Sequence, residues 1–87
     1  MMGTSVWILY VVDTEPSSSI IAAYESEPTA RAVTHDLQTY HGEPQHDWHA
    51  IAATLATQHE YEERSEPDSL YLTRRWHLIE MSLRGGQ

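Results

Sequence analysis

Two apolar segments separated by a polar one near the start of the chain predict a β-hairpin. Apolar side chains fill every position from Val6 to Val12, so both faces of an extended chain would be apolar. This pattern is typical of a strand that is covered on both sides or lies at the centre of a sheet. Residues 13–19 supply turn chemistry, and residues 20–24 resume strand character. We therefore expect a hairpin over residues 6–24 with a long polar loop.

A helix is expected after this hairpin. Ser26 suits a helix cap and Pro28 suits a first helical turn. Apolar residues then recur on one face of a 3.6-residue period, and Gly42 suits the position just beyond the end of the helix. The residues on the apolar face are Ala30, Val33, Leu37 and Tyr40.

A second helix is expected from Asp47, which can cap it. Its apolar face comprises Trp48, Ile51, Ala52 and Leu55. Two interpretations remain open for residues 58–64, because periodicity does not decide between them. The helix could fade through this segment, or the segment could be a strand that pairs with residues 70–74 through a turn at 65–69.

The last third of the chain is rich in β-branched and aromatic residues. Its length, from Leu70 to Leu83, predicts either two short strands or one strand bulged near Arg74 and Arg75. We expect Trp7 and Trp76 to pack together, with Trp48 closing a helix over the sheet. The pattern as a whole predicts an α+β two-layer sandwich, with an antiparallel sheet of three to four strands and one or two helices on one face. Residues 1–83 would form this single domain, and residues 84–87 a flexible C-terminal tail.

The charge and composition of the chain argue against several classes of function. Thirteen Asp and Glu residues face five Arg and no Lys, which gives a net charge of −8. Without a basic patch, direct binding to nucleic acid is disfavoured. The absence of Cys excludes disulfides and thiolate sites, and the longest apolar run is far shorter than the ~20 residues that span a bilayer. No basic leader precedes that run, so a cytoplasmic protein without a membrane partner is the expectation.

The sequence also lacks the common signatures of catalysis. It has no nucleophile elbow, no Gly-rich phosphate loop and no motif of paired carboxylates, and Ser17 to Ser19 are ordinary turn residues. A non-enzymatic protein without a cofactor is therefore expected, and its oligomeric state, monomer or dimer, is left open.

The acidic residues gather in two segments and are the candidate partner-binding site. They could present carboxylates to a basic surface on another protein, as a DNA mimic does, or they could simply form a solvated acidic face. Arg74 and Arg75 are expected to pair with Glu60 or Glu62. The seven candidate residues are Glu60, Glu62, Glu63, Glu66 and Asp68 in one segment, with Glu43 and Asp47 in the other.

Histidines provide a second candidate site. His41, His46 and His49 lie close together beside Asp47, and imidazole with carboxylate suits zinc, nickel or copper. Histidines in a polar surface linker are the ordinary alternative. In either case the six histidines of the chain make its charge depend on pH near 6.5.

Two resemblances add to these patterns. Residues 20–33, together with the closing segment 76–83, resemble small β-β-α-β accessory proteins of actinobacterial phages and mobile elements. This resemblance implies a protein that binds a host protein, for example an inhibitor of a host nucleic-acid-binding protein of the anti-CRISPR type.

The second resemblance concerns the end of the chain. Leu83-Arg84-Gly85-Gly86 is similar to the C-terminal tail of ubiquitin. This implies a ubiquitin-like modifier that is activated at its Gly85-Gly86 pair once Gln87 is removed. A thin diglycine tail can thread the channel of an activating enzyme, where side chains would clash. A frayed terminal tail is the alternative.

Overall fold

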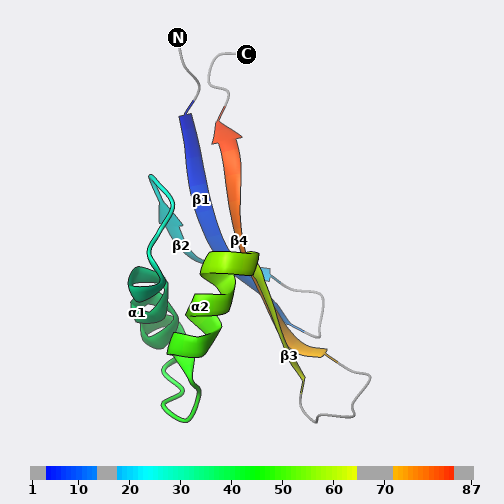
Figure 1. The fold of residues 1–87 in the computed structure, drawn as a ribbon. Helices are drawn as coiled ribbons and strands as arrows, with labels where there is room; N and C mark the ends of the chain where they lie inside the picture. The colour runs from blue at the N-terminus through cyan, green and yellow to red at the C-terminus, as the bar shows by residue number, and fades with distance from the viewer. Residues whose placement is uncertain (1–3, 14–17, 65–71, 84–87) are drawn as a thin grey trace.

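An antiparallel sheet covered on one face by two helices forms the structure (Figure 1). The computed structural model describes residues 4–13, 18–64 and 72–83. The order of strands across the sheet is β2-β1-β4-β3. This confirms the α+β two-layer sandwich expected from the sequence. The elements are β1 (Thr4–Asp13), β2 (Ser18–Tyr24), α1 (Ala30–His41), α2 (Trp48–Gln58), β3 (Glu60–Arg64) and β4 (Leu72–Leu83).

The predicted N-terminal hairpin is formed by β1 and β2. Their pairing runs from Trp7 opposite Tyr24 to Val12 opposite Ser18, with a shift in register after Leu9. On its other side β1 pairs with β4 along its whole length. The strand with the most continuous apolar sequence is therefore central in the sheet, which satisfies one of the two explanations for its pattern.

The helix boundaries follow from local capping. The cap of α1 is Thr29, whose side chain accepts a hydrogen bond from the Ala32 N–H, so the expected cap at Ser26 is wrong. Because a proline disfavours helical backbone in the residue before it, Pro28 keeps the preceding chain extended and delays the helix. Gly42 ends α1 with a φ of 73°, and Asp47 caps α2 through the Ala50 N–H, both as expected.

Residues 58–64, which the sequence left open, form the end of α2 and the strand β3. His59 ends the helix in a left-handed conformation with a φ of 67°, and β3 then pairs with β4. The last strand is single: β4 pairs with β1 in an unbroken register. Its pairing with β3 has an irregularity between Glu63 and Arg64, beside Arg74, which agrees with one strand bulged near that residue.

The hydrophobic core lies between the helices and the sheet. Trp76 is fully buried and packs edge-to-face on Trp48, with their ring centroids 5.8 Å apart. Val11, and not Trp7, lies opposite Trp76, and Trp7 packs beside His59 instead, so the expected pair of Trp7 and Trp76 is not the one observed. The buried residues are Leu9, Val11, Val33, Leu37, Trp48, Ile51, Ala52, Leu55, Trp76 and Leu78.

Candidate functional site

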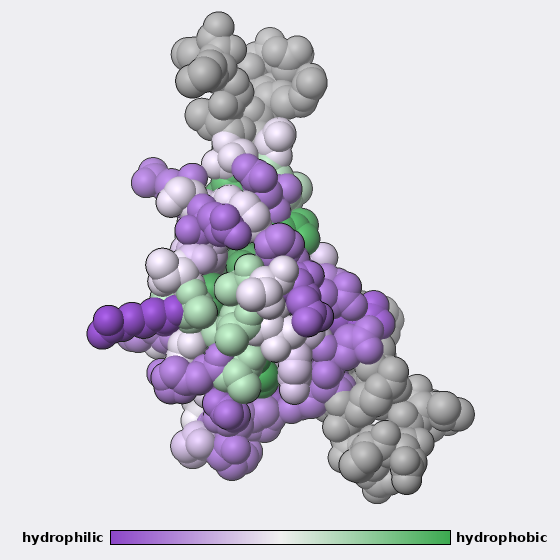
Figure 2. All heavy atoms as spheres, viewed as in Figure 1, coloured by the Kyte–Doolittle hydropathy of each residue, from purple (hydrophilic) through white to green (hydrophobic). Residues whose placement is uncertain are grey.

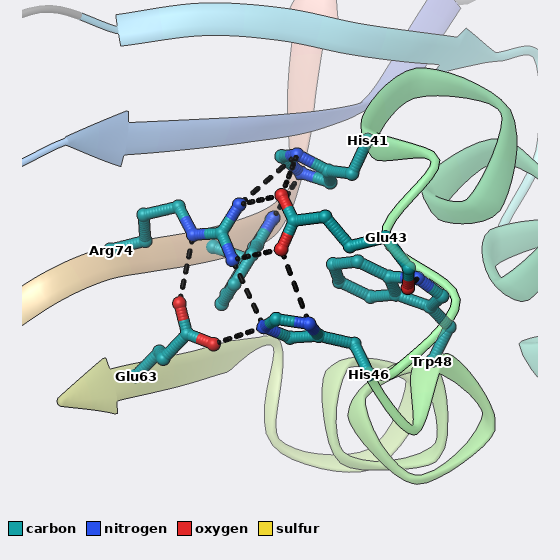
Figure 3. A network of polar contacts seen from close by, with 7 residues as sticks. His41, Glu43, His46, Trp48, Glu63 and Arg74 are labelled. Carbon is teal, nitrogen blue, oxygen red and sulfur yellow. Dashed lines mark hydrogen bonds and ion pairs between the residues drawn. The ribbon is translucent and has the colours of Figure 1, made fainter. Parts of the chain in front are cut away.

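A cluster of polar side chains around Arg74 joins the linker between the helices to the sheet (Figure 3). Arg74 lies on β4, and its guanidinium donates two hydrogen bonds to Glu43 in the linker, at 2.8 and 2.9 Å. Its Nε donates a third, of 2.8 Å, to Glu63 on β3. The Arg74 side chain is only 13% exposed. Since two-point contacts between arginine and carboxylate are strong and directional, this contact fixes the linker against the sheet. We refer to Arg74, Glu43, Glu63, His41 and His46 as the Arg74 cluster.

Two histidines of this cluster stack on Trp48. The ring centroids of His41 and His46 lie 5.0 and 4.9 Å from that of the indole, which lies between them in Figure 3. The Trp48 Nε1–H donates to the carbonyl oxygen of Glu43 at 2.9 Å. Residues at both ends of the linker therefore pack around the Trp48 indole.

Hydrogen bonding determines the protonation state of His41. Its Nε2 accepts a hydrogen bond of 3.0 Å from the Nε1–H of the buried Trp76, so Nε2 carries no proton. Burial lowers the pKa of His41, and the charge of Arg74 lowers that pKa further. His41 is therefore neutral at neutral pH, and its Nδ1 lies 3.3 Å from the guanidinium of Arg74.

The carboxylates of the cluster are held in their charged form. The hydrogen bonds from Arg74 lower the pKa of Glu43. Burial alone would raise the pKa of Glu63, but hydrogen bonds from Arg74 and His46 bring it below its ordinary value. Both carboxylates thus bind partners within the chain. We call the cluster a clamp because it holds the linker between the helices against the sheet.

Most carboxylates of the predicted acidic contact surface that the structure describes interact with other groups of the same chain. Besides Glu43 and Glu63, the carboxylate of Asp47 caps α2. Arg75 lies 3.1 Å from Glu62 and 4.0 Å from Glu60, as the sequence led us to expect. Arg74 instead pairs with Glu43 and Glu63. The remaining two candidates, Glu66 and Asp68, lie outside the described residues, as do Gly85 and Gly86 of the ubiquitin-like tail.

The three histidines proposed as metal ligands do not form a metal site. Within residues 4–13, 18–64 and 72–83, no group of three or more His, Asp or Glu side chains is arranged to hold a metal ion. The physical reason is that His41 and His46 pack against Trp48 and bond to Trp76 and Glu63, while His49 is exposed on α2. His41 and His46 thus make stacking contacts and hydrogen bonds within the chain.

Two surface hollows adjoin the Arg74 cluster, and both are lined in part by His46. One has a volume of about 280 Å³ and is also lined by Trp48, and the other, of about 300 Å³, is also lined by Tyr61. These volumes lie at the lower limit of ~300 Å³ for sites that enclose a small ligand. The cluster is therefore better suited to holding the fold together than to enclosing a substrate.

The sheet face that points away from the helices is a second and more distinctive surface. Residues directly opposite each other on neighbouring strands point to the same side of a sheet, and successive residues alternate between sides. Leu78 is buried under the helices, so its neighbour Ile79 and the residue opposite, Ile8, point away from them. The same rule places an apolar set on the outer side: Val6, Ile8, Tyr10, Val12, Ile20, Ile79 and Met81. We call this set the helix-free face.

Two residues of the helix-free face are strongly exposed to solvent, and the other five are partly buried. Ile20 on β2 is 68% exposed, and Met81 on β4 is 48% exposed. On the side of the helices, Figure 2 shows a small, mostly pale green group of residues over α2 with hydrophilic residues around it. The sequence held a sign of the helix-free face, because the two-sided apolar pattern of residues 6–12 is typical of a strand that is covered on both sides or lies at the centre of a sheet. Within the described residues, the helices cover only one side.

Comparison of the chain with known protein families, with curated proteins and with solved structures found no match. In the part of the chain that the structure describes, no helix combines the length and apolar character needed to cross a membrane. Two features of the molecule itself bear on its function, the Arg74 cluster and the helix-free face.

Proposed function

We propose that this chain is a non-enzymatic protein-binding module whose contact surface is the helix-free face. The observation that supports the proposal is that β1 carries apolar side chains on both of its faces while both helices lie on one side. An antiparallel sheet with one solvated face normally has polar residues there. A contiguous exposed apolar patch is a frequent mark of an interaction surface.

Burial of this face would supply a useful part of the binding free energy. Full burial of one large aliphatic side chain is worth about 1.5–3 kcal/mol. Ile20, at 68% exposure, would gain most of this amount, and Met81, at 48%, about half of it.

The acidic residues would act at the rim of such a contact. Glu60 and Glu62 lie opposite His77 and Arg75 on the outer side of the sheet, beside the apolar residues. Glu43 and Glu63, by contrast, are occupied by Arg74. A basic host protein, including a nucleic-acid-binding protein inhibited in the manner of an anti-CRISPR or DNA-mimic protein, would meet Glu60 and Glu62 more readily, since their side chains are 49% and 36% exposed, against 31% for Glu43 and 21% for Glu63. Charge reversal at these two positions tests that narrower form.

A capture experiment with matched variants tests the proposal. The wild-type chain, Ile20→Arg and Tyr40→Arg are each immobilised and exposed to a native lysate supplemented with the purified chain. Tyr40 is a suitable control because it is a large apolar residue, 47% exposed, on the helix side. We expect bound protein to be lost with Ile20→Arg and kept with Tyr40→Arg. Equal capture by all three baits would refute the helix-free face as the contact surface.

A further inference from the structure

We propose that the protein bound at the helix-free face is a second copy of this chain, which gives a twofold-symmetric dimer with the two sheets packed face to face. This inference rests on the proposed function and names its partner. In such a dimer each copy offers the same patch, so the patch must fit itself. The central residues Ile8 and Ile79 lie opposite each other on β1 and β4, and they would meet the same apolar pair of the second copy.

The dimensions of the face suit a dimer. β1 has 10 residues, and at ~3.4 Å per residue the strand is about 34 Å long. With β3 included, four strands spaced at ~4.8 Å make the outer side of the sheet about 19 Å wide, so its projected area is at most about 600 Å². Standard interfaces bury about 600–1,000 Å² on each partner, and facing sheets pack ~10 Å apart with their side chains interdigitated.

Charge favours this face for the approach of two identical acidic chains. Each chain carries a net charge of −8, so two copies repel each other through most of their surfaces. On the outer side of the sheet, the described side chains carry only Glu60 and Glu62 against Arg75, a sum of −1 with His77 neutral. Most of the negative charge thus lies elsewhere, and repulsion between copies is weakest when they meet through this face.

The composition of β3 disfavours pairing through that edge of the sheet. β3 is a short strand of five residues, Glu60–Arg64, of which four are charged. Short, charged edge strands resist the addition of another strand. The opposite edge, β2, carries no charged residue in Ser18–Tyr24. Pairing through β2 is therefore the competing arrangement that an experiment must separate from the face-to-face dimer.

Sedimentation equilibrium of the purified full-length chain over a range of concentrations tests the dimer. We expect a mass of twice the 10.0 kDa chain at micromolar concentration. Met81→Arg and Ile79→Arg should each weaken the dimer at least about tenfold, because each places a charge in the apolar contact. Tyr40→Arg makes the same change of charge at nearly the same exposure, 47% against 48%, and should leave the dimer unchanged. Arginine also lowers the net negative charge, so added repulsion between acidic chains would not account for a loss of the dimer.

The outcomes separate the two proposals. A wild-type chain that stays monomeric at every concentration refutes the dimer, while the binding function survives if another protein is captured and Ile20→Arg abolishes that capture. A dimer that is equally stable in Met81→Arg, Ile79→Arg and Tyr40→Arg refutes the helix-free face and favours pairing through β2. Circular dichroism of each variant establishes that it is folded. Met81 is half exposed, so its replacement is tolerated even if that of Ile79 is not.

Discussion

Replacement of Arg74 by methionine should cause the largest loss of stability of any single change in the Arg74 cluster. Met is close to Arg in length and can keep the contact with Trp76, over which the guanidinium lies at 4.9 Å. The change removes the three hydrogen bonds to Glu43 and Glu63. Two partly buried carboxylates would then face each other without a cation, and the linker between the helices would lose its anchor.

The expected size of the loss follows from the exposure of the partners. Removal of one partner from a fully buried ion pair costs about 3–5 kcal/mol. Arg74 is 13% exposed, Glu43 31% and Glu63 21%, so solvent relieves part of this cost. A loss of about 2–4 kcal/mol in the free energy of unfolding remains. In a chain of this size it would lower Tm by about 10–30 °C.

Chemical denaturation followed by tryptophan fluorescence measures this loss. Arg75→Met is the matched control, since Arg75 is the next residue on β4, points to the other side of the sheet and is 39% exposed. Its replacement should cost no more than about 1 kcal/mol. A loss below about 0.5 kcal/mol in Arg74→Met, or equal losses in the two variants, would refute the clamp. A double-mutant cycle with Glu43→Gln should give a coupling energy of about 1–3 kcal/mol.

Three further predictions concern other contacts of the same fold. Tyr24→Phe should lower the free energy of unfolding by about 1.5–3 kcal/mol, because Tyr24 donates a hydrogen bond to the Asp36 carboxylate. Thermal denaturation measures this loss, and an unchanged Tm would show that the bond contributes nothing to stability. Trp48→Phe should cost about 1–2 kcal/mol, since it removes the bond to the Glu43 carbonyl and part of the histidine stack, and denaturant midpoints measure it. Acidification should reduce stability in two stages. The pKa of His41 is lowered in the folded state by burial and by Arg74, so its contribution is lost as the pH falls from 6.5 toward the folded pKa. Hydrogen bonds from Arg74 lower the pKa of Glu43. Burial acts to raise the pKa of Glu63, but hydrogen bonds from Arg74 and His46 bring it below its ordinary value. A second loss of stability therefore begins as the pH falls below 4.5. His41→Gln should remove the first stage from a plot of unfolding free energy against pH, and an unchanged plot would contradict the assignment of that stage to His41.

Local signals in the sequence were sufficient for most of the fold. The left-handed conformation at Gly42 and the cap at Asp47 each depend on a single residue type and were predictable. The start of α1 was not, because Ser26 and Thr29 are both good caps and the choice depends on where Pro28 lets the helix begin. Periodicity could not separate helix from strand in residues 58–64, since pairing with β4 decides it.

The Arg74 cluster could not be assembled from the sequence. Arg74 is 31 residues from Glu43 and 11 from Glu63 along the chain. Which of its acidic neighbours each arginine meets depends on the register of β3 against β4, and a shift of one residue would exchange the partners of Arg74 and Arg75. The apolar residues of the helix-free face, in contrast, were visible in the two-sided apolar pattern of β1, although that pattern could not separate a strand covered on both sides from one at the centre of the sheet.

Photo-crosslinking in cells most directly tests the claim that the helix-free face is bound by protein. A photo-reactive residue is placed at Met81 in one chain and at Tyr40 in another, two positions exposed to 48% and 47% on opposite sides of the molecule. We expect a protein adduct from position 81 in clear excess over position 40, and mass spectrometry of the adduct identifies the partner. Equal yields from the two positions, or an adduct from position 40 alone, would contradict the claim.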